Sequence, residues 1–194
     1  RSEQSAVLLA MLADPLDAMR RAAVDLSVDR LRQETAAGIG PELREALRQR
    51  LDDSQAYVRQ RATLLLRDLA DGPAADRVAE LLAHGNEQRP ELLRAYLQMM
   101  TGLPRPLGVK PAIAGLADEA LRSEAAAALS AAFDAGLLGD VQVRQIATIT
   151  RAQLRSHEPD PPLITLLGRV GRDEDWTRIE SWLGSRVPAV KEAA

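Results

Sequence analysis

Few side chains in this sequence have the type and spacing that metal binding requires. The chain has no cysteine and two histidines, His84 and His157, which lie in "AHGN" and "SHEP" at the ends of expected helices. A histidine at a helix C-terminus is common, because it interacts favourably with the helix dipole. No third ligand lies at a suitable spacing from either histidine, so a zinc site is not expected. We predict no metal and no cofactor.

Candidate nucleophiles and acid–base pairs are also missing. Ser181 and Ser185 have no histidine near them in the sequence, and the acidic clusters "DDS" (52–54) and "DED" (173–175) each precede or open an expected helix. Acidic residues stabilise a helix start through its dipole, so the clusters need no catalytic explanation. Neither a GxxxxGK[ST] phosphate loop nor a GxGxxG turn after a strand occurs. We therefore expect no enzymatic activity.

The polar residues that do recur lie at fixed offsets from an aliphatic residue and an alanine. "LADPLDAMRRAA" (12–23) and "LDDSQAYVRQRA" (51–62) share an Asp, then an aliphatic residue, an Arg and an Ala. The core of this pattern, aliphatic–cation–x–x–Ala, also occurs at 121–125 and at 190–194. A unit of about 30–40 residues that recurs in this way is typical of a helical repeat protein.

Apolar residues between these positions follow helical periodicity. In "PELREALRQRLD" they fall at Leu43, Leu47 and Leu51, and the preceding "GIGP" places Pro41 at the first position of a helix. Short loops rich in Gly, Pro and Asp separate about eleven or twelve such helices, which form pairs. "PRPLGVKP" (104–111) is predicted to be a proline-rich connector, and no segment has the alternation of a strand.

These features resemble the HEAT repeat family, including the short bacterial HEAT-like (PBS-lyase-type) repeats. "LLGRVGRDEDWTRIESWLGSRVPAVKEAA" carries the resemblance most fully, and the units around "GNEQRPELLRAY" and the fifth helix pair carry it least. The resemblance implies an all-α, right-handed α-solenoid of about six two-helix repeats, the last of them truncated. We expect residues 1–194 to form a single domain that is a piece of a longer array or multidomain protein.

The acidic residues of the pattern lie where a loop enters the second helix of each pair. Asp14, Asp53 and Asp118 can there cap free backbone N–H groups. The following aliphatic residue and Ala are expected to face the core. The resemblance further implies that the cation reaches the Asp of an adjacent unit and so forms a ladder. The cations of this expected structural ladder are Arg20, Arg59 and Arg122.

Composition limits the kind of core, the membrane topology and the compartment that can be expected of the chain. The chain has 46% hydrophobic but only 3% aromatic residues, so the core must be aliphatic, and its net charge is −3. No apolar run is long enough to cross a membrane. The excess of Arg over Lys fits a GC-rich bacterial genome. A cysteine-free chain is compatible with both cytoplasm and periplasm, and we take the cytoplasm as the first choice.

We predict a non-catalytic protein–protein interaction scaffold that uses the concave surface of second helices. The expected partner-binding residues are Arg21, Gln60, Arg67, Arg94, Gln98 and Trp182. Trp182 lies at the edge of an apolar face, whereas Trp176 shares that face with Ile179 and Leu183 and is expected in the core.

Two other functions stay open. The first is nucleic-acid binding, as in the HEAT-like alkylpurine glycosylases, for which Arg21, Arg32, Arg61, Arg67 and Arg94 would supply a basic stripe. The second is a regulatory domain of a larger enzyme.

Overall fold

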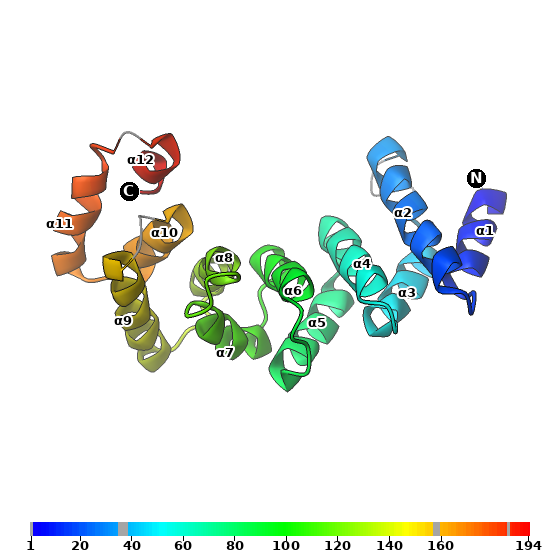
Figure 1. Cartoon of the computed structure of the whole chain (residues 1–194), viewed down its shortest axis with the longest axis horizontal. Coiled ribbons are helices and arrows are strands. Elements are labelled where there is room, and N and C mark those ends of the chain that lie inside the picture. The colour runs from blue at the N-terminus through cyan, green and yellow to red at the C-terminus, as the bar shows by residue number, and fades with distance from the viewer. Residues whose placement is uncertain (1, 35–38, 157–159, 186) are drawn as a thin grey trace. The chain divides into compact units, whose positions relative to one another are not determined.

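The computed structural model of the chain describes residues 2–34, 39–156, 160–185 and 187–194. Within these ranges the protein is all-helical and contains no strand, as Figure 1 shows. The chain divides into two compact units, Arg1–Val78 and Ala79–Ala194, which are described separately below. The single domain expected from the sequence stays a prediction.

The first unit consists of two helical hairpins and the start of a third. Helix α1 packs against α2 and α3, α2 packs against α4, and α3 packs against α4. A single 3₁₀ turn, η2, extends α3 toward the loop before α4. The elements are α1 (Ser2–Leu12), α2 (Asp17–Glu34), α3 (Pro41–Gln49), η2 (Arg50–Asp52), α4 (Ala56–Asp68) and α5 (Gly72–His84), which continues into the second unit.

In the second unit the even-numbered helices form a row in which each packs against the next even-numbered helix. Helix α6 contacts α8, α8 contacts α10, and α10 contacts α12. The intervening helices pack on this row, α7 on α6 and α8, and α9 and α11 on α10. The elements are α6 (Pro90–Gly102), α7 (Pro106–Gly115), α8 (Arg122–Asp134), α9 (Asp140–Ser156), α10 (Pro161–Val170), α11 (Asp173–Trp182) and α12 (Pro188–Ala193).

Proline and glycine set many of the helix boundaries. Five helices begin with proline, which lacks the N–H that has no partner in the first turn and has its φ already fixed near the helical value. The start at Pro41, predicted from "GIGP", is confirmed. After α5 and α8 the chain turns at Gly85 and Gly136, both with a φ of 68°. After α4 the same left-handed position is occupied by Ala70 at φ 50°.

The core is aliphatic, as the composition predicts. Leu43, Leu47 and Leu51, spaced one helical turn apart, are all buried in the first unit. Tyr96 is the largest fully buried side chain, and the other members of that group are Leu, Met and Ile. Among the described residues no helix is both long and apolar enough to cross a bilayer.

Two local predictions are wrong. The segment 104–111 is not a connector, because α7 begins at Pro106 and continues through Pro111 to Gly115. Proline at the first helical position favours the helix, and the second proline interrupts only one backbone hydrogen bond. The aliphatic position of the first repeat is also not in the core, since Met19 is 37% exposed while Ala23 is fully buried.

Candidate functional site

The acidic residues of the pattern, and Ser185 before its fourth copy at 190–194, order the loops that lead into the second helices. In each of four loops a side-chain oxygen accepts the backbone N–H of the residue two positions later. The donor lies just before the helix and not in its first turn, so the contact orders the loop entrance. The acceptor oxygens and their distances are Asp14 Oδ1 2.8 Å, Asp53 Oδ1 2.9 Å, Asp118 Oδ1 2.8 Å and Ser185 Oγ 3.1 Å.

The arginine in three copies of the pattern also donates a hydrogen bond to a backbone carbonyl at the start of the same loop. Arg20 Nη1 donates to the carbonyl oxygen of Asp14 at 2.9 Å, and Arg59 Nη1 donates to that of Asp53 at 2.7 Å. Arg122 Nε donates to the carbonyl oxygen of Leu116 at 3.3 Å. In all three cases the acceptor lies six residues before the arginine, so one geometry recurs in both units.

One contact of the expected ladder joins two consecutive hairpins. Arg20 donates from Nε to Asp53 Oδ2 at 2.7 Å and from Nη2 to Oδ1 at 3.2 Å, and it also bonds Asp17. The side chains of Arg20 and Asp53 are 9% and 2% exposed. Burial by itself raises the pKa of the Asp53 carboxyl, but the bonds from Arg20 and Gln55 outweigh it and lower the pKa below its usual value. The contacts described above for Arg59 and Arg122 run instead to backbone carbonyls of their own loops.

Two further ion pairs connect first helices, and the sequence analysis missed them. Arg48 of α3 binds both carboxylate oxygens of Asp71, which precedes α5, at 2.8 Å each. Arg151 of α9 binds both oxygens of Asp175 in α11 at 2.7 and 2.6 Å. The hydrogen bonds from Arg151 lower the pKa of Asp175 below its usual value despite its burial. Both pairs join an arginine in one first helix to an aspartate at the start of the next first helix. This sequence pattern could have identified them.

The expected partner-binding residues of the first unit lie on α2 and α4. Arg21 is exposed, and its guanidinium lies 4.7 Å from the centre of the Tyr57 ring. Gln60 is half-buried, and Arg67 donates to the carboxylate of Asp68 from Nη2 at 2.6 Å. The structure therefore places all three on second helices, as the sequence predicts, but Arg21 and Arg67 already have intramolecular contacts.

The three expected residues of the second unit have different environments. Arg94 of α6 donates from Nε to the carbonyl oxygen of Ala120 at 2.7 Å, in the loop before α8, so it also fixes a neighbouring loop. Gln98, one turn further along α6, is half-buried. Trp182 is half-buried, with the guanidinium of Arg178 5.4 Å from its ring centre.

Trp176 is not a core residue, contrary to the prediction. It is 49% exposed, and Leu183, seven residues later, is 48% exposed. Helix α11 buries a narrow face that contains Asp175 and Ile179, and Trp176 lies about 100° around the helix from Asp175. Helical periodicity correctly predicts that Ile179 is buried. It wrongly predicts burial of Trp176 and Leu183, because the buried Asp175 occupies part of the face that packs on the rest of the unit.

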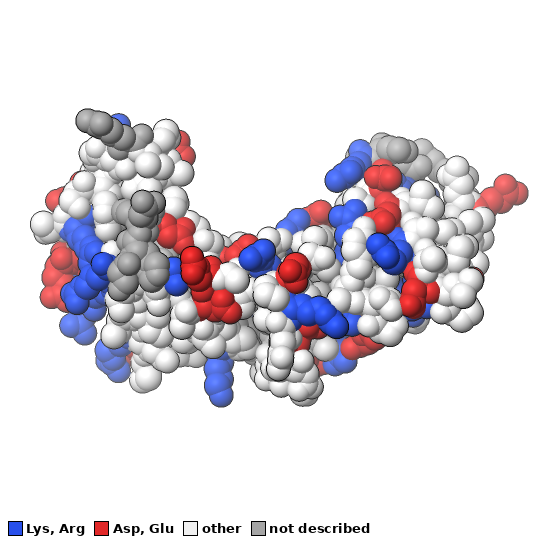
Figure 2. All heavy atoms as spheres, in the orientation of Figure 1, with Lys and Arg blue, Asp and Glu red and all other residues white. Residues whose placement is uncertain are grey.

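The arginines considered for phosphate binding are engaged in other contacts. Arg61 Nε lies 3.0 Å from Asp25 Oδ1, and Arg32 Nη1 lies 3.6 Å from Asp29 Oδ1. Arg21, Arg67 and Arg94 have the contacts given above. On the face drawn in Figure 2 acidic and basic side chains are interspersed. Arg32, Arg61 and Arg67 are thus paired with carboxylates, whereas the contacts of Arg21 and Arg94 are to an aromatic ring and a backbone carbonyl.

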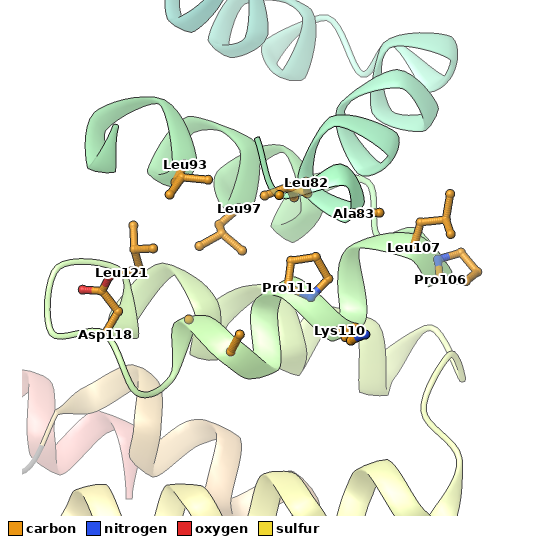
Figure 3. Close-up of a pocket in the computed structure, with 13 residues that line it drawn as sticks. Leu82, Ala83, Leu93, Leu97, Pro106, Leu107, Lys110, Pro111, Asp118 and Leu121 are labelled. Atoms are coloured by element: carbon orange, nitrogen blue, oxygen red, sulfur yellow. The ribbon is translucent and has the colours of Figure 1, made fainter. Parts of the chain in front are cut away.

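A groove in the second unit lies between the end of α5, helix α6 and helix α7 (Figure 3). Its volume is about 520 Å³. The buried side chains of Leu82, Leu97 and Leu121 contribute to its lining, and Leu107, which is 54% exposed, lies toward one end. Lys110 and Asp118 are the charged residues of the lining. The sequence analysis did not identify this groove.

Histidine and carboxylate side chains do not form a metal site in the part of the chain that the structure describes. No three of them gather closely enough to hold an ion there. His84 Nδ1 lies 2.6 Å from the carbonyl oxygen of Glu80, one turn earlier in α5. His157 lies outside the described residues.

Comparisons with known proteins add information on the fold alone. No protein-family model matches the chain, and neither does any curated protein. An engineered protein of known crystal structure is similar, with a TM-score of 0.60, over 96% of this chain and 91% of its own. The two sequences are 16% identical, so the chain shares a fold with that protein and no function is implied.

Proposed function

We propose that the chain is a HEAT-like α-solenoid that serves as a non-catalytic scaffold for protein–protein interaction. In this proposal six helical hairpins form a right-handed array, and the second helix of each hairpin faces the partner. The succession of contacts from α6 to α8 to α10 to α12 supports it most directly, because a row of stacked second helices is the arrangement that gives helical repeat proteins an extended binding surface. The recurring loop geometry and the Arg20–Asp53 contact support the repeat assignment.

The expected contact positions follow from this arrangement. Arg21, Gln60 and Arg67 would serve in the first unit, and Gln98 and Trp182 in the second. Arg94 is a weaker choice for a binding test, because its bond to the carbonyl of Ala120 means that a charge reversal would also perturb the loop. Nucleic-acid binding is the less favoured alternative, since the arginines that it would use are engaged with other groups.

Site-specific photo-crosslinking in cells tests the proposal. A photoreactive residue would replace Arg21 or Gln98 on second helices and, as a matched control, Arg144, which is exposed on the first helix α9. We expect discrete protein adducts from positions 21 and 98 and none from position 144. Equal adducts from all three positions, adducts to nucleic acid, or no adduct from any position would contradict the proposal.

A further inference from the structure

The groove of the second unit has one side built by α7, whose two faces are chemically different. One face carries glycines that allow close packing: a Cβ on Gly108 would lie 2.8 Å from Met100 Sδ, and one on Gly115 would lie 3.1 Å from the Cβ of Ala125. This face is therefore fixed against α6 and α8, where a larger side chain would not fit.

The other face of α7 lines the groove. Leu107, Lys110, Pro111 and Ala114 lie three and four residues apart, which places them along one stripe of the helix. Leu107, Lys110 and Ala114 are exposed, and Pro111 is half-buried. The stripe is thus a predominantly apolar surface that the folded chain leaves open to solvent.

Charged groups lie toward the two ends of this surface. Figure 3 shows Lys110 beside Pro111 toward one end and Asp118 beside Leu121 at the other. Asp118 Oδ1 accepts the N–H of Ala120, and neither Lys110 nor Asp118 has an ion pair with another residue that the structure describes. This differs from the arginines of the chain, many of which are paired. Lys110 lies within α7, and Asp118 lies three residues beyond the end of that helix, in the loop before α8.

We propose that this groove binds an amphipathic α-helical segment of a partner protein. The segment would insert two leucine-like side chains and would carry an acidic residue near Lys110 and a basic residue near Asp118. The inference goes beyond the second-helix surface of the proposed function, because the groove is built by the first helices α5 and α7 together with α6. A helix that lays its apolar side into a groove is a common mode of peptide recognition.

The match of volume and polarity supports this occupant. About 520 Å³ is within the range of ligand sites, and an apolar floor of Leu82, Leu97 and Leu121 provides burial for aliphatic side chains. The exposed rim is open along the groove, which suits an extended ligand better than an enclosed small molecule. Opposite charges at the two ends select against ligands with two like charges.

Three labelled helical peptides distinguish the outcomes with the full chain. Each has about fifteen residues, two leucines one turn apart and one charged residue on either side of them: one acidic and one basic, two acidic, or two basic. Fluorescence anisotropy should show the peptide with both charges binding best. Asp118→Asn keeps the oxygen that accepts the N–H of Ala120 and should remove the preference for the peptide with both charges over the acidic one, and Lys110→Glu should shift the preference to the basic peptide, each by about two- to five-fold at low salt.

A second pair of variants tests the groove itself. Ala114→Arg fills it and should abolish binding of all three peptides, whereas Ala152→Arg, at an exposed position of α9, should have no effect. Circular dichroism checks that both variants fold. Unchanged binding by Ala114→Arg, or a peptide preference that neither charge variant changes, would overturn the inference. Binding of laurate but of none of the peptides would also overturn it. A dimer that is detected by analytical ultracentrifugation and that Ala114→Arg dissociates would overturn it as well.

Failure here is separable from failure of the proposed function. Protein adducts from photoreactive residues at positions 21 and 98, together with no peptide binding, would remove the groove inference and leave the scaffold proposal intact.

Discussion

The contact between Arg20 and Asp53 gives the sharpest prediction about stability, through the variant Asp53→Asn. Asparagine has the same shape and its oxygen can still accept the N–H of Gln55, but its amide nitrogen then replaces Oδ2, so the change removes both the charge and the acceptor of the bonds from Arg20 Nε and Arg50. Loss of one partner from a fully buried ion pair costs about 3–5 kcal/mol. Here Arg20 keeps the carbonyl oxygens of Asp14 and Pro15 as acceptors, so it is not left without partners.

We therefore expect Asp53→Asn to lower the free energy of unfolding by about 1.5–2.5 kcal/mol at pH 7. For a chain of this size the melting temperature would fall by about 4–8 °C. Urea denaturation followed by circular dichroism measures the difference. Asp52→Asn is the matched control, because Asp52 is half-exposed and pairs at the surface with Arg77, and it should cost less than about 0.5 kcal/mol.

The pH dependence of the same difference provides an independent check. The pKa of Asp53 is lower in the folded chain than its usual value of 3.8. Stabilisation by such a group is complete above the unfolded pKa and is lost as the pH falls through the folded one. The difference between wild type and Asp53→Asn should thus be full at pH 7 and should shrink below about pH 4. A difference under about 0.5 kcal/mol at pH 7, or one that persists unchanged in acid, would refute the reasoning.

Three further stability predictions use the same urea assay. Ala70→Gly should stabilise the chain by about 0.5–1 kcal/mol, because position 70 has a φ of 50° that favours glycine; a loss of stability would contradict this. Asp71→Ala should cost about 2–3 kcal/mol, since it removes two hydrogen bonds from an arginine and one from the N–H of Ala74; a cost below 1 kcal/mol would show that the pair is weak. Gly108→Val should cost about 1–3 kcal/mol by pressing a branched side chain onto Met100; a neutral effect would mean that α7 can move outward.

The sequence predicts the helices well where local chemistry sets them. Pro41 begins α3 and the leucines that follow it at one-turn spacing are buried, because the start signal and the apolar period agree. The recurring Asp residues also lie where the pattern places them, in the loops before second helices, and the Arg residues lie at the start of those helices. Prediction fails at α7, where Pro106 and Pro111 suggest a connector although the first begins a helix and the second is tolerated in it.

The interaction surfaces depend on packing that periodicity does not encode. Trp176 is exposed because the buried face of α11 is narrowed by Asp175, whose partner Arg151 comes from a different helix. The groove between α5, α6 and α7 lies beside a helix, α7, that packs closely on α6 and α8 through Gly108 and Gly115. Both features require knowing which helix lies beside which, and that information is not local.

Removal of the last hairpin tests the central claim of stacked helical repeats most directly. In a repeat array each hairpin depends on its neighbours alone, so deleting residues 171–194, which contain α11 and α12, should expose one face of α10 and leave the remaining hairpins folded. Amide hydrogen exchange should show unchanged protection in α6 and α8 of the shortened chain and faster exchange only in α9 and α10. Loss of protection throughout residues 79–170 would contradict the repeat architecture.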